Sequence, residues 1–177
     1  MEKSRTIFWN NNNDENSRTI LWNNNEFQEN SGIPIYLAPC SLGKISGNFG
    51  QNNSLNGIEI GGSCFEFQEG FLLSFFPNPD FPYVRKGDLE IPAFATLEIK
   101  EGAMVKFLGG ALKIKGNLEN KATSQNPAIF TSLYDDQNGK DTNNDGSQTQ
   151  PQKGDWKGIE IEPGKANLEN IKILYAF

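Results

Sequence analysis

The chain has 177 residues, a formal net charge of −6, 18 glycines and no histidine. This length fits one domain with a hydrophobic core, and the abundance of glycine and asparagine favours a turn-rich β protein. The missing histidine excludes the commonest general base, and the acidic balance disfavours nucleic acid and anionic membranes as partners. No apolar run is long enough to span a bilayer, so we predict a single all-β domain over residues 1–177.

The first thirty residues contain two nearly identical stretches, SRTIFWNNN and SRTILWNNN, which are offset by 13 residues. A shortened coil or a local duplication would account for this offset, and we predict irregular coils over residues 1–30. The opening MEKSRTIFWNNNN lacks the apolar core of a signal peptide. If the protein is secreted, as we expect below, its signal has been removed or the chain is a fragment.

From ILWNNNEFQENSGIPIYL onward the chain repeats itself with a period of about 23 residues. KISGNFGQNNSLNGIEI is the next copy, and the column of strands continues through FPYV, MVKF and AIFT. A second column aligns DLEI with ALKI. The residue pairs that this alignment predicts are Trp22–Ile45, Ile35–Ile58, Ile60–Val84, Val84–Phe107 and Leu89–Leu112.

Each short segment alternates apolar and polar residues, which is the pattern of a strand with one buried face. Glycine, asparagine or proline separates the segments, so one period holds about three strands, as in one coil of a parallel β-solenoid. We predict about seven coils of 21–25 residues, stacked ~4.8 Å apart.

Two residue types recur at the corners of the predicted coils. Asn25 would lie over Asn48 and Asn30 over Asn53, either as a ladder of side-chain amides or because asparagine tolerates left-handed turns. Cys40 and Cys64 are about one period apart, and both a disulfide and stacked thiols remain open.

The stretch EGFLLSFFPNPDFPYV is rich in aromatic residues and proline, and proline opposes regular strand pairing. We predict an irregular coil whose rings fill the core. Exposed rings would instead offer stacking surfaces for sugars. The aromatic residues considered for that alternative are Trp9, Phe75, Phe76, Phe81 and Tyr83.

Outward positions on the predicted strands carry charges of both signs, which discourages sideways aggregation. We interpret them as solubility devices rather than as catalytic acids and bases, and Arg85 with Asp88 as a solvated corner. The outward charges are Glu59, Glu98, Lys100, Lys106, Lys113, Lys115, Glu160 and Glu162.

An insertion of about one coil's length separates ALKI from its next match, GIEI. We predict an acidic polar loop over residues 134–156 that projects from a coil corner. Within it, DTNNDG resembles the start of a calcium loop, in which Asp141, Asn143 and Asp145 converge on one cation. The turn at Gly146 would permit this convergence, and a backbone carbonyl near Ser147 could add another ligand.

The glutamate that usually ends a calcium loop is missing, because Gln152 stands at its position. Asp135, Asp136 or Asp155 would have to fold back and complete the site. A solvated acidic loop without metal is the alternative interpretation. A bound calcium ion would act as a staple rather than as a sensor, since the loop has no helices to move.

The stretch from LEIKEGAMVKF to GDWKGIEI resembles right-handed parallel β-helix proteins of the pectate-lyase-like superfamily, of the prokaryotic surface or secreted type. The similarity covers about residues 45–175. The residues that carry it are Gly102, Phe130, Thr131, Asp135, Asp136, Gly154, Asp155 and Trp156. The resemblance implies an extended extracellular rod, and it does not imply catalysis.

These features favour a non-catalytic extracellular scaffold. The C-terminal NLENIKILYAF has a strand pattern without a cap. The chain is therefore either a segment of a longer rod or a unit that stacks head to tail with copies of itself. A carbohydrate-active β-helix, either a polysaccharide lyase fragment or a glycan-binding or adhesin module, is the alternative.

Overall fold

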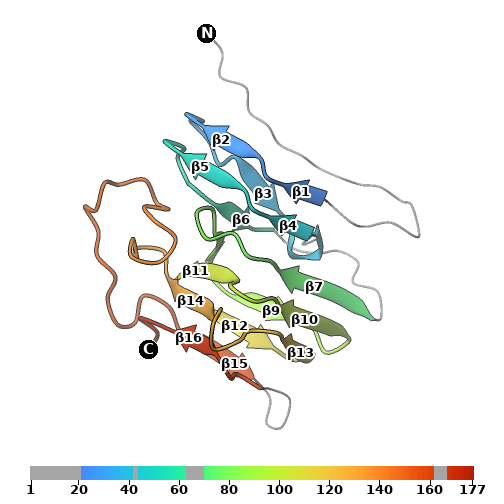
Figure 1. Ribbon diagram of the computed structural model, residues 1–177. Coiled ribbons are helices and arrows are strands. Elements are labelled where there is room, and N and C mark those ends of the chain that lie inside the picture. Colours follow the sequence, from blue (N-terminus) through green and yellow to red (C-terminus); the bar gives the residue numbers. More distant parts are fainter. Residues whose placement is uncertain (1–20, 42–43, 63–69, 162–166) are drawn as a thin grey trace.

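The computed structural model describes residues 21–41, 44–62, 70–161 and 167–177 (Figure 1). Short strands dominate, with one 3-10 turn, η1 (Pro39–Ser41). None of the described residues forms a helix able to cross a membrane. The strands are β1 (Leu21–Asn23), β2 (Glu26–Gln28), β3 (Ile35–Leu37), β4 (Lys44–Ser46), β5 (Phe49–Gln51), β6 (Ile58–Ile60), β7 (Phe71–Phe75), β8 (Tyr83–Lys86), β9 (Leu89–Ile91), β10 (Ala95–Ile99), β11 (Met104–Leu108), β12 (Ala111–Ile114), β13 (Asn117–Asn120), β14 (Ala128–Ser132), β15 (Gly158–Ile161) and β16 (Ile171–Ile173).

All paired strands are parallel and stack along one axis, so the fold is an all-β parallel β-helix, as predicted. The longest sheet has six strands in the order β16-β14-β11-β8-β6-β3. Two three-stranded sheets, β13-β10-β7 and β15-β12-β9, form the other sides, and β1-β4 and β2-β5 pair near the N-terminal end (Figure 1). The solenoid has about four turns rather than the predicted seven. Part of the difference arises because the insertion uses about one coil's length of chain without adding a strand.

The predicted period is confirmed by the strand register. Trp22 pairs with Ile45, Ile35 with Ile58, and Leu89 with Leu112. Each pair therefore lies on adjacent coils, with backbone hydrogen bonds between them.

The predicted register was wrong by one residue at β8. Val84 was predicted to pair with Ile60 and Phe107, but Arg85 pairs with these two residues. Val84 pairs instead with Glu59 and Lys106 on the outward face, and Tyr83 is the residue that points inward. The sequence misled because both residues of the pair Tyr83–Val84 are apolar. An apolar residue suits this outward position, because Val84 packs there against Leu55 and Leu133 in a small cluster separate from the main core.

Inward side chains form one continuous core, and stacked aromatic rings run along it. The Phe107 ring packs on that of Trp156, with centroids 4.7 Å apart, and on that of Phe130 at 6.5 Å. The prediction that the proline-rich stretch fills the core is confirmed for its fully buried rings, which are Phe75, Phe81 and Tyr83. The predicted irregular coil is wrong for the two strands of this stretch, because β7 and β8 pair in regular register with β10 and β11. Phe76 is only half-buried, and Trp9 lies outside the described residues.

The asparagine ladders are present at both corners. In the first ladder, Asn25 donates from its backbone N–H to Asn48 Oδ1 (3.0 Å), and Asn48 donates in the same way to Asn78 Oδ1 (3.2 Å). Side-chain amides repeat both steps.

The second ladder has the same construction. Asn30 donates from its backbone N–H to Asn53 Oδ1 (3.0 Å), and Asn53 donates to Asn56 Oδ1 (3.1 Å). Side-chain amides again repeat both steps, at 2.7 and 3.1 Å. The sequence predicted the first pair of each ladder but neither Asn78 nor Asn56, because these two residues do not fall on the 23-residue period.

Cys40 is disulfide-bonded in this structure. Cys64, which the period places near it, lies outside the described residues. The first copy of the 13-residue repeat also lies outside them, whereas β1 and β2 of the following segment pair regularly with β4 and β5.

Candidate metal centre on the inserted loop

The insertion between β14 and β15 lies back across the outer face of the six-stranded sheet instead of projecting from a corner. Thr142 O accepts a hydrogen bond from the backbone N–H of Asn56 at 2.7 Å. The ammonium of Lys140 pairs with Asp80 at 3.0 Å. The loop therefore runs beside the N-terminal coils, as the orange segment in Figure 1 shows.

Lys106 anchors this loop to the sheet. Its side chain was expected in solvent, but it is fully buried beneath the insertion. Its Nζ donates to the carbonyl oxygens of Asp135 (2.8 Å) and Lys140 (3.0 Å). Burial lowers the pKa of Lys106 to about 8, although the nearby carboxylates act in the opposite direction.

Glu98, another predicted outward charge, and Arg85, predicted as a solvated corner, are also integrated into the fold. Glu98 is largely buried and accepts hydrogen bonds from Ser74 Oγ (3.0 Å) and Lys100 Nζ (2.6 Å). Arg85 donates to the backbone oxygens of Asp88 and Ile60 at 2.8 and 3.0 Å. Its guanidinium therefore secures a corner between coils through backbone contacts.

Three aspartates of the insertion converge. One carboxylate oxygen from each of Asp136, Asp141 and Asp145 lies within 4.8 Å of the others. The Asp141 carboxylate also accepts the backbone N–H groups of Asp145 (3.0 Å) and Gly146 (2.8 Å), which closes the predicted turn. Gly146 has a φ of 65°, a left-handed conformation that glycine adopts without a steric cost.

Two oxygens of the loop are buried and have no hydrogen-bond partner, Asp136 Oδ1 and Asn143 Oδ1. The Asn143 amide nitrogen donates to Asp145 Oδ2 (2.7 Å) and Thr149 Oγ1 (2.9 Å), so its carbonyl oxygen remains open. A buried oxygen without a partner is costly unless a donor or an ion satisfies it. The oxygen-rich donor set suits calcium.

The electrostatics of the triad are asymmetric. Burial raises the pKa of Asp136, and the negative charges of Asp141 and Asp145 raise it further. The hydrogen bond from Thr149, followed by backbone N–H groups, lowers the pKa of Asp145. A cation at the triad would relieve the repulsion felt by Asp136, because an opposite charge favours the ionised carboxylate.

The remaining predicted ligands have other roles. Ser147 Oγ donates to Asp136 Oδ2 at 3.0 Å and so lies at the edge of the triad. Asp135 is buried and binds Thr131 Oγ1 (2.6 Å) and Asn138 Nδ2 (2.8 Å). Asp155 binds Ser132 Oγ (2.5 Å) and the Gln152 N–H (2.9 Å), which closes the base of the loop. Of the three candidate fold-back carboxylates, Asp136 is the one that reaches the triad.

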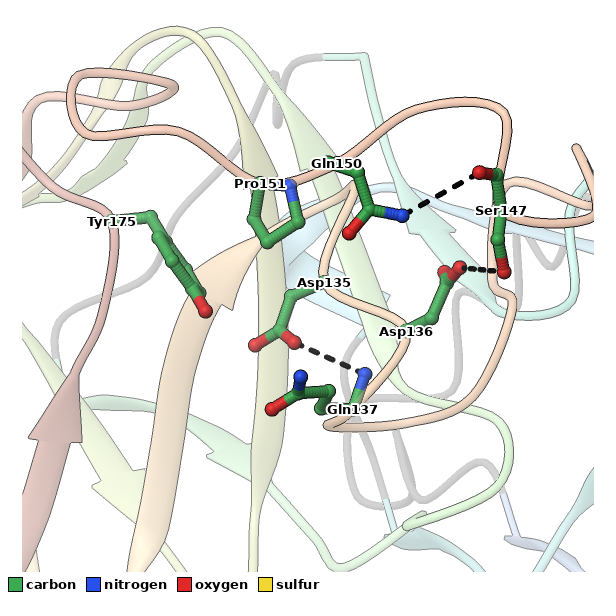
Figure 2. A pocket seen from close by; sticks show the side chains of 7 residues that line it. All are labelled: Asp135, Asp136, Gln137, Ser147, Gln150, Pro151 and Tyr175. Atoms are coloured by element: carbon green, nitrogen blue, oxygen red, sulfur yellow. Dashed lines mark hydrogen bonds between the residues drawn. The ribbon is translucent and has the colours of Figure 1, made fainter.

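A polar cavity of about 360 Å³ adjoins the triad. Figure 2 shows Asp136 and Ser147 on one side of it and Tyr175 on the other. The C-terminal segment brings Tyr175 there, because Tyr175 O accepts the Gly154 N–H at 3.1 Å. Nothing in the sequence pattern indicated this residue. The lining residues are Asp135, Asp136, Gln137, Ser147, Gln150, Pro151 and Tyr175.

No protein-family model matches the chain, and neither a curated protein nor a solved structure matches it. The parallel β-helix class therefore rests on the structure itself.

Proposed function

We propose that the protein is a non-catalytic structural β-solenoid of an extracellular or cell-surface scaffold, stapled by calcium and able to stack end to end. The observation that carries this proposal is how the outer faces are used. Charges on them pair between coils, and the chain's own insertion covers the outward residues Val84, Lys106 and Thr131 on the middle strands of the longest sheet. Both arrangements serve the stability of a rod.

The paired charges run along the axis. Lys113 pairs with Asp88 (2.5 Å), and Lys115 pairs with Glu90 (2.8 Å), in each case across one coil step. Such exposed pairs contribute only about 0–1 kcal/mol each. We infer that these charge pairs keep the strand surfaces soluble and favour the observed register between adjacent coils.

The insertion supplies the calcium staple. Asp136, Asp141 and Asp145 would bind the ion through carboxylate oxygens, and Asn143 through its free Oδ1. The two unsatisfied buried oxygens support this assignment. Bound calcium would supply positive charge that holds the tip of the loop to its base.

Thermal unfolding with calcium or with a chelator tests the staple. At a calcium concentration of about 100 times Kd, the free energy of unfolding should rise by about 2.7 kcal/mol. The variant Asp145→Asn should lose most of this rise, whereas Asp80→Asn, at a half-exposed aspartate outside the triad that pairs with Lys140, should retain it. An unchanged melting midpoint for the wild type would remove calcium from the proposal.

The C-terminal coil exposes core positions that inner coils bury. Ile173 of β16 is 39% exposed, whereas its partner on β14, Phe130, is 0% exposed. In the part of the chain that the structure describes, β13, β15 and β16 each pair on one side only, as do β1, β2 and β3. A second copy stacking head to tail would cover these edges.

Charges along one sheet alternate in sign between coils. Glu90, Lys113 and Glu160 align across three coils, so β15 presents an anion at its unpaired edge. Analytical ultracentrifugation and electron microscopy should show assembly that grows with concentration, and Ile173→Lys should weaken it. A monodisperse monomer at all concentrations would contradict end-to-end stacking.

The extracellular location is supported by the disulfide-bonded Cys40, because disulfides persist in oxidising compartments. The prokaryotic surface type rests on the sequence resemblance alone. Thiol titration of the unfolded protein should find no free thiol. The non-catalytic part of the proposal is tested by incubation with acidic polysaccharides. Formation of unsaturated products would instead favour a polysaccharide lyase.

A further inference from the structure

The two asparagine ladders start in the same coil but end in different places. The last residue of the first ladder, Asn78, is fully buried, and its amide nitrogen donates to Ile45 O at 2.7 Å within the regular coils. The second ladder ends at Asn56, which is 8% exposed and lies beneath the insertion. The two ladders join the same pair of coils, but only the second one contacts the insertion, so the first ladder is a control for the second.

Asn56 connects the second ladder to the base of the aspartate triad. Its Nδ2 donates to Asp141 O at 2.9 Å, across 85 residues of sequence. Its backbone N–H donates to the next carbonyl, Thr142 O, at 2.7 Å. Asp141 is also the residue whose carboxylate closes the turn at Gly146. The side-chain and backbone groups of Asn56 thus hold the peptide that carries a proposed ligand.

The geometry points to Asn56 as a positioning residue that couples the insertion to the N-terminal coils through the second ladder. Its Oδ1 accepts both the backbone N–H and the side-chain amide of Asn53, and Asn53 does the same for Asn30. When the insertion is in place, the side-chain amide of Asn56 is hydrogen-bonded to Asn53 through Oδ1 and to Asp141 O through Nδ2. When the insertion opens, the bond to Asp141 O is lost, and the hydrogen bonds along the second ladder should weaken with it, because linked hydrogen bonds strengthen one another.

This coupling deepens the proposed calcium staple, and its response to calcium rests on that proposal. An ion that orders the loop should stabilise Asn53 and Asn30 more than Asn48 and Asn25, although all four lie in the same two coils. By reciprocity, weakening the second ladder should lower calcium affinity by the same factor. The ladder contacts themselves exist without an ion.

Amide hydrogen exchange measured by NMR tests the coupling at individual ladder donors. The backbone N–H groups of Asn30 and Asn53 report on the second ladder, and those of Asn25 and Asn48 report on the first. Calcium should slow exchange at the second ladder by about tenfold more than at the first. Global unfolding exposes all four amides equally, so it cannot produce this difference. Equal slowing in both ladders would overturn the inference.

The variant Asn56→Asp removes the hydrogen bond to Asp141 O and keeps the acceptor for Asn53. A carboxylate still accepts from Asn53, but it cannot donate to Asp141 O and would face that oxygen. Calorimetry should show calcium binding weakened by about tenfold, with the difference between the ladders abolished at saturating calcium. The matched control is Asn48→Asp in the first ladder, which should retain both the wild-type affinity and the calcium response at Asn30 and Asn53.

A third variant separates failure of the coupling from failure of the calcium staple. Lys106→Met loosens the insertion without an ion and without touching either ladder. If calorimetry finds no calcium binding, the staple fails, and exchange in Lys106→Met then decides the coupling. Faster exchange confined to Asn30 and Asn53 supports the coupling, and unchanged exchange there contradicts it.

Discussion

The regular coils and the insertion are held together by different interactions. In the coils, apolar side chains about one period apart stack inward, and parallel strands exchange backbone hydrogen bonds, as at Leu89 and Leu112. In the insertion, polar side chains bind backbone groups nearby in sequence, as Asp141 does with Gly146, or reach across to the sheet, as Lys106 does. The coils therefore carry most of the stability, whereas the insertion depends on a few polar anchors.

The largest effect should come from a ring at the centre of the coils. Phe107→Ala removes a fully buried ring that stacks between Phe130 and Trp156, and it leaves a cavity. We expect a loss of about 3–5 kcal/mol in the free energy of unfolding, measured in urea. Phe94→Ala, at a ring that is 44% exposed, should cost much less. Equal losses would mean that the coil core is not the main source of stability.

Two adjacent glycines test how closely the coils approach. A Cβ on Gly110 would lie 2.0 Å from the backbone carbon of Gly87 on the next coil, whereas a Cβ on Gly109 would meet nothing within 4 Å. Both residues have positive φ, so each alanine variant pays about 1–2 kcal/mol of strain. Gly110→Ala should cost about 2 kcal/mol more than Gly109→Ala. Thermal unfolding of the two variants measures this difference.

Lys106→Met should affect the insertion rather than the coils. The change removes a buried ammonium and leaves two loop carbonyls without their donor. Opening of the loop should become easier by about 2 kcal/mol, or roughly 30-fold in local opening, with a smaller change in global stability. Limited proteolysis within residues 134–156 should accelerate accordingly. Lys140→Met, which removes an exposed pair with Asp80 and an exposed cation–π contact with Phe49, should change the rate much less.

The smallest effect should be a pH-dependent one at Glu98. Burial acts to raise the pKa of Glu98, but hydrogen bonds from Lys100 and Ser74 outweigh it, so the pKa lies below the ordinary 4.5. A carboxylate with a lowered pKa stabilises the fold above pH 4.5, and this contribution is lost as the pH falls through the lowered value. Glu98→Gln should therefore cost under about 1 kcal/mol at pH 7 and nothing in strong acid.

A matched variant isolates this contribution. Glu119→Gln removes the exposed partner of Lys121, a pair 3.2 Å apart with both side chains about half exposed. Urea unfolding of this variant should show almost no pH-dependent difference from the wild type. If Glu119→Gln lost as much stability as Glu98→Gln, the burial of Glu98 would not matter.

The sequence predicted the coils well because their stability comes from a repeated pattern. The alternation around Glu59, Lys106 and Lys113, together with the 23-residue period, identifies the strands and most of their partners. The pattern failed at Val84, where two apolar residues stand side by side and only the packing of Tyr83 into the core decides the register.

The candidate metal centre could be predicted only in part. The turn chemistry of DTNNDG is local, so it indicated Asp141 and Asp145, which the structure brings together, and it also proposed Asn143 as a ligand. It could not choose among Asp135, Asp136 and Asp155 as the completing carboxylate. That choice depends on contacts with β14. The hydroxyl of Thr131 donates to Asp135 and that of Ser132 donates to Asp155, so only the Asp136 carboxylate lies with those of Asp141 and Asp145.

By itself the sequence determined the parallel solenoid, the period, the start of both asparagine ladders and the place of the insertion. These follow from side-chain alternation and from turn residues, which act over a few positions and repeat. Only the tertiary structure decided that the insertion lies across the sheet, that Lys106 is buried beneath it and that Asn56 reaches Asp141. Those contacts join segments far apart in the chain and obey no period, so they arise only when the coils have stacked.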